Sequence, residues 1–322
     1  MRSFKTKGFG LIELMISILV ASIIVAGLYK MLSSSWLNFG ISSATARSGK
    51  SARQVDNYVN NLMFQAGFVN IKNVMQNRLY VKQQSKFGTD AAYYNDGDWI
   101  DGSFILGGTE ANGNSKVKFR FYGSSLDDDL AGETDKTANG FIFDCRGQVV
   151  PNTVMLEVEL SVNDDGLVCN QKTLVSEDGS NWDLDDPVIV DSNVKAMRIL
   201  YGTTIYGRGG AFYPASSVKT HWPYINLVKY SIVTAQNTAQ NIVKAQRGST
   251  KTLFSAGDYV ANSSPCPTTE VQDRLVYAVV CDQTVGNVQA NFNSYQIPDD
   301  QLSYMHKVIS GTVSLVNSSN FN

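Results

Sequence analysis

The most prominent hydrophobic pattern in the chain is an apolar run close to its N-terminus. Residues Phe9 to Tyr29 contain one charged side chain, Glu13, and follow a short basic leader, residues 1–8, that ends in glycine. A helix of this length crosses a hydrocarbon core of about 30 Å. Because basic side chains favour the cytoplasmic side of a membrane, the leader should stay inside and the bulk of the chain should be exported.

Glu13 is the one residue in this run that needs an explanation. A carboxylate within a membrane helix costs about 3 kcal/mol and is usually paired or functional. No small-residue cleavage site follows the run, whereas Gly8 stands just before it, so a cut after Gly8 would make Phe9 the mature N-terminus. Glu13 would then lie one turn from the new amine, near the positive end of the helix dipole, and would pair with that amine or a neighbouring subunit's. The alternative is an ordinary signal anchor with a stray Glu near the membrane surface.

A helical period continues beyond the apolar run. Apolar side chains recur every three to four residues at Val55, Tyr58, Val59, Leu62, Met63 and Ala66. The first proline is Pro151, so nothing forces a helix to break in this part of the chain. We therefore predict one helix from the membrane run to about Gly67, roughly 90 Å long, with an amphipathic second half. Gly27, Gly40 and Gly49 should weaken it by up to about 1 kcal/mol each.

Strand-like alternation and turn residues replace the helical period from about residue 68. The predicted strands are Lys116–Tyr122, Phe141–Cys145, Thr153–Val162, Ala196–Tyr201, Ile225–Val233, Arg274–Cys281 and Val308–Val316. The predicted loops are Asn95–Gly102, Gly107–Ser115, Ser124–Gly140 and Asp178–Pro187, and Asn237–Ser264 is predicted as a polar insertion. One long helix followed by strands predicts an α+β fold, in which a membrane-spanning helix packs under a large antiparallel β-rich globular head.

The pattern divides the chain into four parts. Residues 1–8 form a leader, 9–30 the transmembrane half of the helix, 31–67 its amphipathic half, and 68–322 an exported head. The net charge is −2 and becomes −5 when the three basic residues of the leader are removed. An acidic chain without a Lys/Arg cluster argues against a broad nucleic-acid-binding face.

All four cysteines lie on the exported side of the membrane segment, where an oxidising periplasm favours disulfides. They are Cys145, Cys169, Cys266 and Cys281. Of the three possible pairings we expect Cys145–Cys169 and Cys266–Cys281, because each closes a short loop, and each should contribute about 3 kcal/mol. The alternative is four reduced, buried thiols. A metal site is not expected, because no C-x-x-C pair exists and the chain has two histidines, His221 and His306.

Other sequence motifs give only weak indications of a functional site. The acidic turns Asp96–Gly102 and Asp127–Glu133 match calcium loops only in part, and solvated turns are the simpler interpretation. Tyr93, Tyr94 and Trp99 are candidates for an interface anchor, and a core position explains them equally well. No nucleophile, metal-ligand or phosphate-binding motif is present. The sequence therefore predicts no enzymatic activity, no metal and no cofactor.

Residues 7–14, KGFGLIEL, resemble the prepilin processing and methylation motif of type IV pilins and type II secretion pseudopilins. In that family a membrane peptidase cuts after the glycine and methylates the new N-terminus, and a glutamate shortly after the cut supports assembly. The resemblance implies that Gly8 is the cleavage residue, Phe9 the N-methylated residue and Glu13 the assembly carboxylate. The family usually has threonine where this chain has Gly10.

The head resembles PilW-type minor pilins in its length, its cysteine placement and four patches. These patches are Phe141–Gly147, Val194–Gly202, Trp222–Tyr230 and Gly311–Asn317. The family often continues the Tyr-Gly pair of the second patch with an acidic residue, whereas Thr203 stands here, so a ligand role for that position does not carry over. The resemblance implies a small tip complex that primes pilus assembly, with prepilin peptidase, other minor pilins, the major pilin and a tip adhesin as partners.

The expected function is therefore structural: a minor pilin of a type IV pilus, serving motility, adhesion or DNA uptake. It would be stored in the bacterial inner membrane as a single-pass protein with a periplasmic head, and would reach the cell surface in the pilus. A minor pseudopilin of a type II secretion system is the runner-up, because the processing motif is shared. A head that binds DNA or a glycan is the alternative of another class, and the negative charge disfavours DNA.

Overall fold

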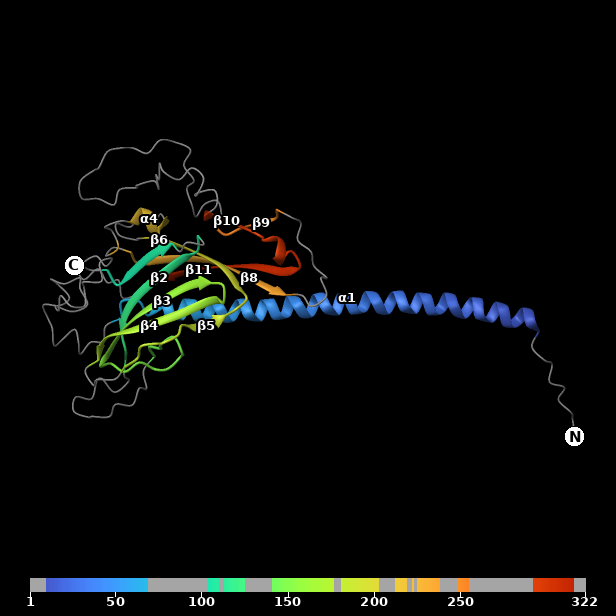
Figure 1. Ribbon diagram of the computed structural model, residues 1–322, viewed down its shortest axis with the longest axis horizontal. Coiled ribbons are helices and arrows are strands. Elements are labelled where there is room, and N and C mark those ends of the chain that lie inside the picture. The colour runs from blue at the N-terminus through green and yellow to red at the C-terminus, as the bar shows by residue number, and fades with distance from the viewer. Residues whose placement is uncertain are drawn as a thin grey trace, which may run out of the picture.

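The structure consists of one long helix that projects from a β-rich head (Figure 1). It is a computed structural model, and it describes residues 10–68, 103–109, 113–124, 141–176, 181–202, 212–218, 222, 225–237, 248–254 and 292–315. The first half of the helix stands clear of the head, and the second half lies along it. This is the α+β arrangement expected from the sequence, in which a long helix packs against a β-rich head.

Helix α1, Leu11–Phe64, is continuous over 54 residues and so about 80 Å long. It passes through Gly27, Gly40 and Gly49 without interruption. The chain leaves the helix at Gly67, whose φ of 76° lies in the left-handed region, and whose N–H donates to the carbonyl of Arg120. A Cβ at this position would stand 2.8 Å from the Phe104 ring. Glycine is therefore required here both by conformation and by space, and the predicted helix end is confirmed to within three residues.

The described part of the head contains two antiparallel sheets and a short strand pair. The five-stranded sheet has the order β1 (Ile105–Thr109), β2 (Ser115–Tyr122), β3 (Val154–Asn163), β4 (Gly166–Ser176) and β5 (Val188–Asp191). The four-stranded sheet has the order β11 (Tyr304–Ser314), β8 (Leu227–Asn237), β6 (Val194–Gly202) and β7 (Phe212–Pro214). Strands β9 (Thr250–Thr252) and β10 (Ser294–Gln296) form the pair, and short helical segments span Ala215–Val218 (α4) and Asp299–Gln301 (η3).

One hydrophobic core is shared by both sheets and the buried face of α1. Alternation along β3 places five apolar side chains in this core: Val154, Leu156, Val158, Leu160 and Val162. The period of 3.6 along α1 adds Val55, Val59, Leu62 and Met63 from the helix side. Strand β8 is buried on both faces, because a second cluster around Leu253 and Phe254 covers the side of its sheet that faces away from α1. The helix therefore completes the head rather than only supporting it.

Two sequence predictions about the head are wrong. Segment Phe141–Cys145 is not a strand but one arm of a tight turn, with a single bridge between Phe143 and Val149. Its apolar residues reflect packing of a loop against the helix end. Segment Gly107–Ser115 is not a loop throughout, because Gly107 to Thr109 belong to β1 and pair with β2. Two adjacent glycines suggested a turn, whereas Gly107 lets the strand pass over the Tyr201 ring, since a Cβ there would stand 2.3 Å from its hydroxyl.

Candidate functional site: the exposed half of α1

The start of α1 is capped by Glu13. Gly10 is the N-cap residue, with φ −71° and ψ 148°, and its carbonyl accepts the N–H groups of Glu13 and Leu14 at 3.0 and 3.3 Å. The Glu13 carboxylate turns back and accepts the Gly10 N–H at 3.2 Å through Oε2. This is the reciprocal arrangement of a capping box, with a backbone carbonyl in place of a cap side chain. The negative charge therefore lies at the positive end of the helix dipole.

Gly8 and Phe9, the predicted cleavage and methylation residues, lie outside the described residues. Glu13 is placed, and its carboxylate is exposed at the helix end that points away from the head. Residue 9 directly precedes Gly10, whose N–H the carboxylate already binds. In sequence, a new amine at residue 9 would thus lie four residues before Glu13.

The first half of α1 presents apolar side chains in every direction. Leu11 and Ile12 are 80% and 72% exposed, and the same holds for the large apolar residues as far as Tyr29. The polar groups of this part are satisfied within the helix: the Ser17 hydroxyl donates to the Glu13 carbonyl and the Ser22 hydroxyl to the Leu19 carbonyl, at 2.7 and 2.8 Å. By length and composition α1 is the one helix of the described chain that could cross a membrane.

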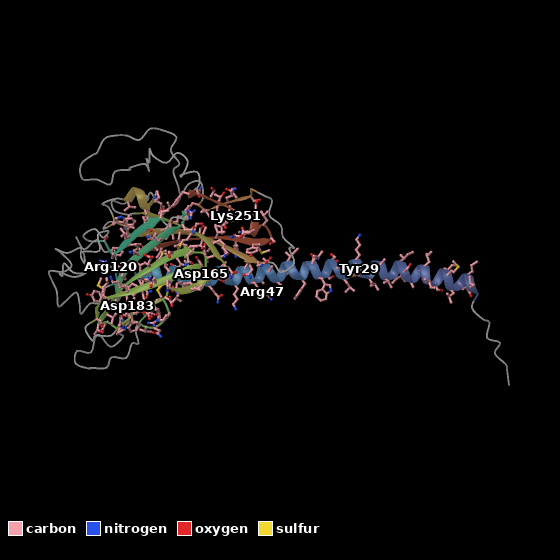
Figure 2. The ribbon with its side chains drawn as sticks, in the orientation of Figure 1. Tyr29, Arg47, Arg120, Asp165, Asp183 and Lys251 are labelled. Atoms are coloured by element: carbon pink, nitrogen blue, oxygen red, sulfur yellow. A yellow bond between two sulfur atoms is a disulfide. The ribbon has the colours of Figure 1, made fainter. Side chains whose placement is uncertain are left out.

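Exposed apolar surface continues beyond the length that a bilayer covers. From Leu11 to Tyr29 the helix rises about 28 Å, which already matches a hydrocarbon core of about 30 Å. Past Lys30 a further set of large side chains remains exposed: Met31, Leu32, Trp36, Leu37, Phe39 and Ile41. Figure 2 shows these side chains standing free around the helix between Tyr29 and Arg47. This segment, 31–41, thus exposes six large apolar side chains, interspersed with serine, asparagine and glycine, beyond the length that spans a bilayer.

Contact with the head begins where α1 carries small residues. Ser48 and Ala52 are buried, followed by the larger Val55 and Val59 one and two turns later. The Ser51 hydroxyl donates to a carboxylate oxygen of Asp191 at the end of β5. The helix packs mainly on β11 and β8 and also touches β5, so that edge strands of both sheets border it. One face of the second half is thus fixed to the head while the opposite face stays open.

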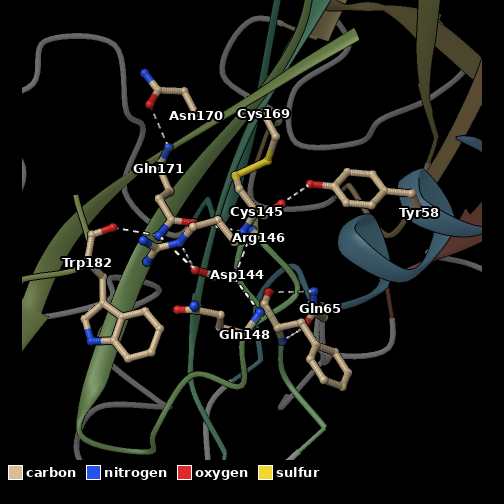
Figure 3. The surroundings of a disulfide bond; sticks show 11 residues. Tyr58, Gln65, Asp144, Cys145, Arg146, Gln148, Cys169, Asn170, Gln171 and Trp182 are labelled. Atoms are coloured by element: carbon tan, nitrogen blue, oxygen red, sulfur yellow. Dashed lines mark hydrogen bonds and ion pairs between the residues drawn. A yellow bond between two sulfur atoms is a disulfide. The ribbon is translucent and has the colours of Figure 1, made fainter. Parts of the chain in front are cut away.

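A disulfide supports the loop that receives the far end of α1 (Figure 3). Cys145 and Cys169 are bonded, which is one of the two expected pairs, and both are buried. The Tyr58 hydroxyl donates to the Cys145 carbonyl at 2.8 Å. Gln65 binds both backbone groups of Phe143, accepting its N–H and donating to its carbonyl. Since Cys169 lies on β4, next to edge strand β5, the disulfide fixes the loop that contacts the helix end to the five-stranded sheet.

Asp144 organises this loop from within. Its buried carboxylate accepts the N–H groups of Arg146 and Gln148 and also binds the Arg146 side chain at 3.0 Å. Gln171 accepts the Cys145 N–H and donates to Asp144 and to the Trp182 carbonyl. Burial, reinforced by the negative charge of Asp144, raises the pKa of Tyr58 well above its ordinary value, so the phenol stays protonated and able to donate.

Sequence reasoning did not find the polar roles of these residues. Tyr58 was expected only as part of an apolar stripe, and Asp144 drew no interpretation. The one signal in the chain was their neighbourhood: Asp144 directly precedes a cysteine, and a turn glycine, Gly147, follows with φ 76°. Asn, Asp or Gln beside a cysteine is too common a pattern to identify such a network from sequence.

The remaining candidate residues contribute little to a site. Cys266 and Cys281, both acidic turns, the aromatic residues at 93, 94 and 99, and His221 lie outside the described residues. His306 is half-buried on β11, where its Nδ1 lies 3.0 Å from the Tyr304 carbonyl. Within the described part of the chain no group of three or more His, Cys, Asp or Glu side chains is placed to hold a metal ion.

Comparison with known proteins bears on the N-terminus. Residues 3–29 match the family model described as the prokaryotic N-terminal methylation motif. The chain carries a prepilin-type N-terminus. The motif covers the leader, Glu13 and the membrane-length part of α1, and it does not extend into the head. It supports membrane anchoring through α1.

The head has weaker counterparts. No curated protein matches the chain. Among solved structures the chain is similar to the type IV-like pilin TTHA1219 from Thermus thermophilus, with 10% sequence identity and a TM-score of 0.32, over 68% of this chain and 86% of that chain. This similarity is too low to say anything about the head.

Proposed function

We propose that this chain is a membrane-stored subunit of a type IV pilus, assembled into the fibre through α1 after cleavage between Gly8 and Phe9. The proposal is a structural role without catalysis. It is supported by the methylation motif at residues 3–29 and by the prepilin-like order of leader, capped Glu13 and long apolar helix. In the stored state, α1 spans the inner membrane, and the head lies in the periplasm.

The observation that carries the proposal is the apolar surface of residues 31–41. A membrane anchor needs about 20 apolar residues, and α1 supplies these before Lys30. The additional exposed side chains, with Trp36 at 70% and Phe39 at 72%, would face water in an isolated anchored protein. Exposed apolar surface of this extent marks a binding face. In a fibre, packing against neighbouring helices covers this segment together with the former membrane segment.

Glu13 sets the register of this packing in the proposed fibre. When α1 moves from the membrane into the core of a fibre, the Glu13 carboxylate stays in an apolar environment. In such an environment an ion pair with a positive N-terminal amine is favoured over an unpaired charge. The hydrogen bond to Gly10 holds the carboxylate at the helix end, where such an amine would approach. A single charge in an otherwise apolar contact selects one axial position, in the way that one buried polar residue fixes coiled-coil register.

A minor, tip-located pilin of the PilW type is the finer form of the proposal. The four patches that carry this resemblance include the disulfide loop, β6, part of β8 and the end of β11. A head of two full sheets is bulky for a repeating shaft and is more easily accommodated at a tip. The partners would be prepilin peptidase, other minor pilins, the major pilin and a tip adhesin. A minor pseudopilin of a secretion system would carry the same N-terminal motif. The proteins that it binds would distinguish it from a pilus subunit.

Two Glu13 variants test the proposal. Glu13→Gln keeps an acceptor for the Gly10 N–H but removes the charge, whereas Glu13→Ala removes both. We expect both variants to insert into the membrane and both to be depleted from sheared surface fibres, while the wild-type chain is recovered there with pilus proteins. Wild-type chain that is absent from the fibre fraction would contradict the proposal. Recovery with secretion-system proteins would assign the chain to a pseudopilus instead.

A further inference from the structure

A row of three cations lies on the exposed face of α1. Arg47, Lys50 and Arg53 follow one another at intervals of three residues, and all are exposed. They point away from the face that carries Ser48, Ala52 and Val55 into the head. Figure 2 shows the Arg47 side chain directed away from the head at the point where α1 enters it. We refer to Arg47, Lys50 and Arg53 as the cationic row.

No carboxylate of the described residues forms an ion pair with this row. Two carboxylates on or beside this part of α1 accept hydrogen bonds from neutral hydroxyl groups: Asp56 accepts from Tyr230, and Asp191 accepts from Ser51. Lys307 of β11 adds further positive charge beside the row, with its Nζ 3.9 Å from where a Cβ on Gly49 would stand. Between Glu13 and Asp56 the helix has no acidic residue at all. Like charges at such spacing destabilise an isolated helix, so the row is unfavourable without a partner.

We propose that the cationic row docks against an exposed carboxylate edge on the head of the neighbouring pilin subunit, an inference that rests on the proposed function. The row continues the apolar segment 31–41 along the same open side of α1, so a neighbour that covers that segment reaches the row as well. The apolar part supplies the association energy, and the charged part selects the partner and its orientation.

This chain itself shows what such a carboxylate edge looks like. Two pairs of exposed acidic side chains flank edge strand β5, one in the β3–β4 turn beside its end and one in the approach to its start. Among the described residues no cation lies within ion-pair distance of these four side chains: Asp164, Asp165, Asp185 and Asp186. Strand β5 closes the five-stranded sheet and borders α1. A related head with a comparable edge would place carboxylates at the height of the row. The positive helix face of one subunit and the negative sheet edge of its neighbour would thus be complementary in charge.

Lipid and nucleic acid are poorer partners for the row. Arg47 lies 18 residues beyond Tyr29, about 27 Å along the helix. That distance exceeds the Debye length of about 8 Å at physiological ionic strength, so lipid headgroups act on it weakly when α1 is upright. Nucleic-acid affinity depends on the number of phosphates that the protein neutralises. Three cations beside an acidic sheet edge can neutralise only a few phosphates.

Charge variants of the full-length chain in its native host test this contact. The variant Arg47→Glu/Lys50→Glu/Arg53→Glu should reduce the fibre-associated share about tenfold, as expected when three weak exposed ion pairs become repulsions. The variant Arg47→Lys/Arg53→Lys keeps the charges and should behave as wild type. Arg53→Glu and Lys172→Glu form a matched pair of single exposed reversals, and only the first should lower incorporation. Equal membrane levels and an intact Cys145–Cys169 disulfide confirm that the variants fold.

A photoreactive residue at Gln54 identifies the partner. Gln54 is exposed and adjacent to Arg53. A cross-link to a pilin-head peptide that contains Asp or Glu supports the inference, whereas cross-links confined to lipid or nucleic acid overturn it. Wild-type incorporation of the triple Glu variant also overturns it and leaves the proposed function intact. Wild-type chain that never enters a fibre overturns both.

Discussion

The hydroxyl of Tyr230 on β8 donates a hydrogen bond of 2.6 Å to Oδ1 of Asp56 on α1. The Tyr230 ring reaches the helix by lying over Gly311, its cross-strand partner on β11, where a Cβ would stand 2.3 Å from the hydroxyl. Burial, the bond to Asp56 and its charge raise the pKa of Tyr230 above its ordinary value, so the donor proton is retained. A glycine on one strand thus permits a polar contact between the next strand and the helix.

Tyr230→Phe should lower the free energy of unfolding by about 1–2 kcal/mol, because Asp56 loses a donor while the ring stays in place. Gly311→Ala should cost about 1–3 kcal/mol, since its Cβ displaces the ring as well as the hydroxyl. Both are measured by chemical unfolding of the full-length chain in detergent micelles. Gly27→Ala is the control, because nothing lies within 4 Å of the added Cβ. Equal stability of Gly311→Ala and wild type would show that the ring does not depend on this glycine.

Two neighbouring ion pairs on β2 and β3 offer a comparison between a buried and an exposed pair. Arg120 binds Glu157 Oε2 through Nε and Nη2 at 2.8 and 2.6 Å, with side chains 1% and 8% exposed. Lys118 and Glu159 lie two register positions away, on the same face of the sheet, 3.5 Å apart and 27% and 29% exposed. We expect Glu157→Ala to cost about 3–5 kcal/mol and Glu159→Ala less than about 1 kcal/mol.

The difference between these two variants is the informative quantity. Both remove a carboxylate from the same face of the same strand, so helix docking and sheet pairing are affected alike. Similar losses in urea or guanidinium unfolding would mean that the burial of Arg120 does not determine the cost.

Removal of the disulfide should weaken the packing of the C-terminal end of α1 against the head. Cys145→Ser/Cys169→Ser opens a link between residues separated by 24 positions, with an expected loss of about 3 kcal/mol in unfolding free energy. The loop that accepts the Tyr58 hydroxyl then relies on its hydrogen bonds, chiefly those of Asp144, Gln171 and Gln65. Hydrogen exchange should therefore accelerate at the last turns of α1 more than at its first turns in micelles. Uniform acceleration along the whole helix would contradict this local role.

His306 should make the protein less stable in mild acid. Burial lowers the pKa of His306 below its ordinary value of 6.5, and the positive charge of Lys251 lowers it further. The contact with the Tyr304 carbonyl acts in the opposite direction and is smaller than the effect of burial. The folded chain therefore keeps this imidazole neutral at a pH where the unfolded chain protonates it. The resulting stability is full above about pH 6.5 and is lost as the pH falls below it. His306→Gln should flatten the fall in thermal midpoint between pH 7 and 5, and an unchanged slope would exclude this histidine as its origin.

The long helix and several strands were predictable from repeating patterns of apolar residues. The helical stripe from Val55 to Ala66 and the absence of proline predicted α1, and alternation predicted β2 and β3 within a few residues. Strands β4 and β5 were missed: β4 carries polar side chains at Asn170, Gln171 and Lys172, which weaken the alternation. Its place between β3 and β5 comes from cross-strand pairing that one segment does not reveal.

The contacts that fix the helix to the head were less predictable, because they join residues far apart in sequence. Tyr58 meets Cys145, and Asp56 meets Tyr230, through positions that only the sheet order brings together. The carboxylate of Glu13 was singled out from sequence because it breaks an apolar pattern. Its bond to Gly10 was not anticipated, since a glycine offers no side chain to suggest a cap.

The central claim is that the chain is cut before Phe9 and enters a fibre with its apolar helix attached. The mass of the N-terminal peptide, from chain recovered in both the inner membrane and the sheared fibre fraction, tests it most directly. We expect a peptide that begins at Phe9 and carries one additional methyl group in both fractions. A peptide that begins at Met1, or a mature chain that begins after Tyr29, would contradict it.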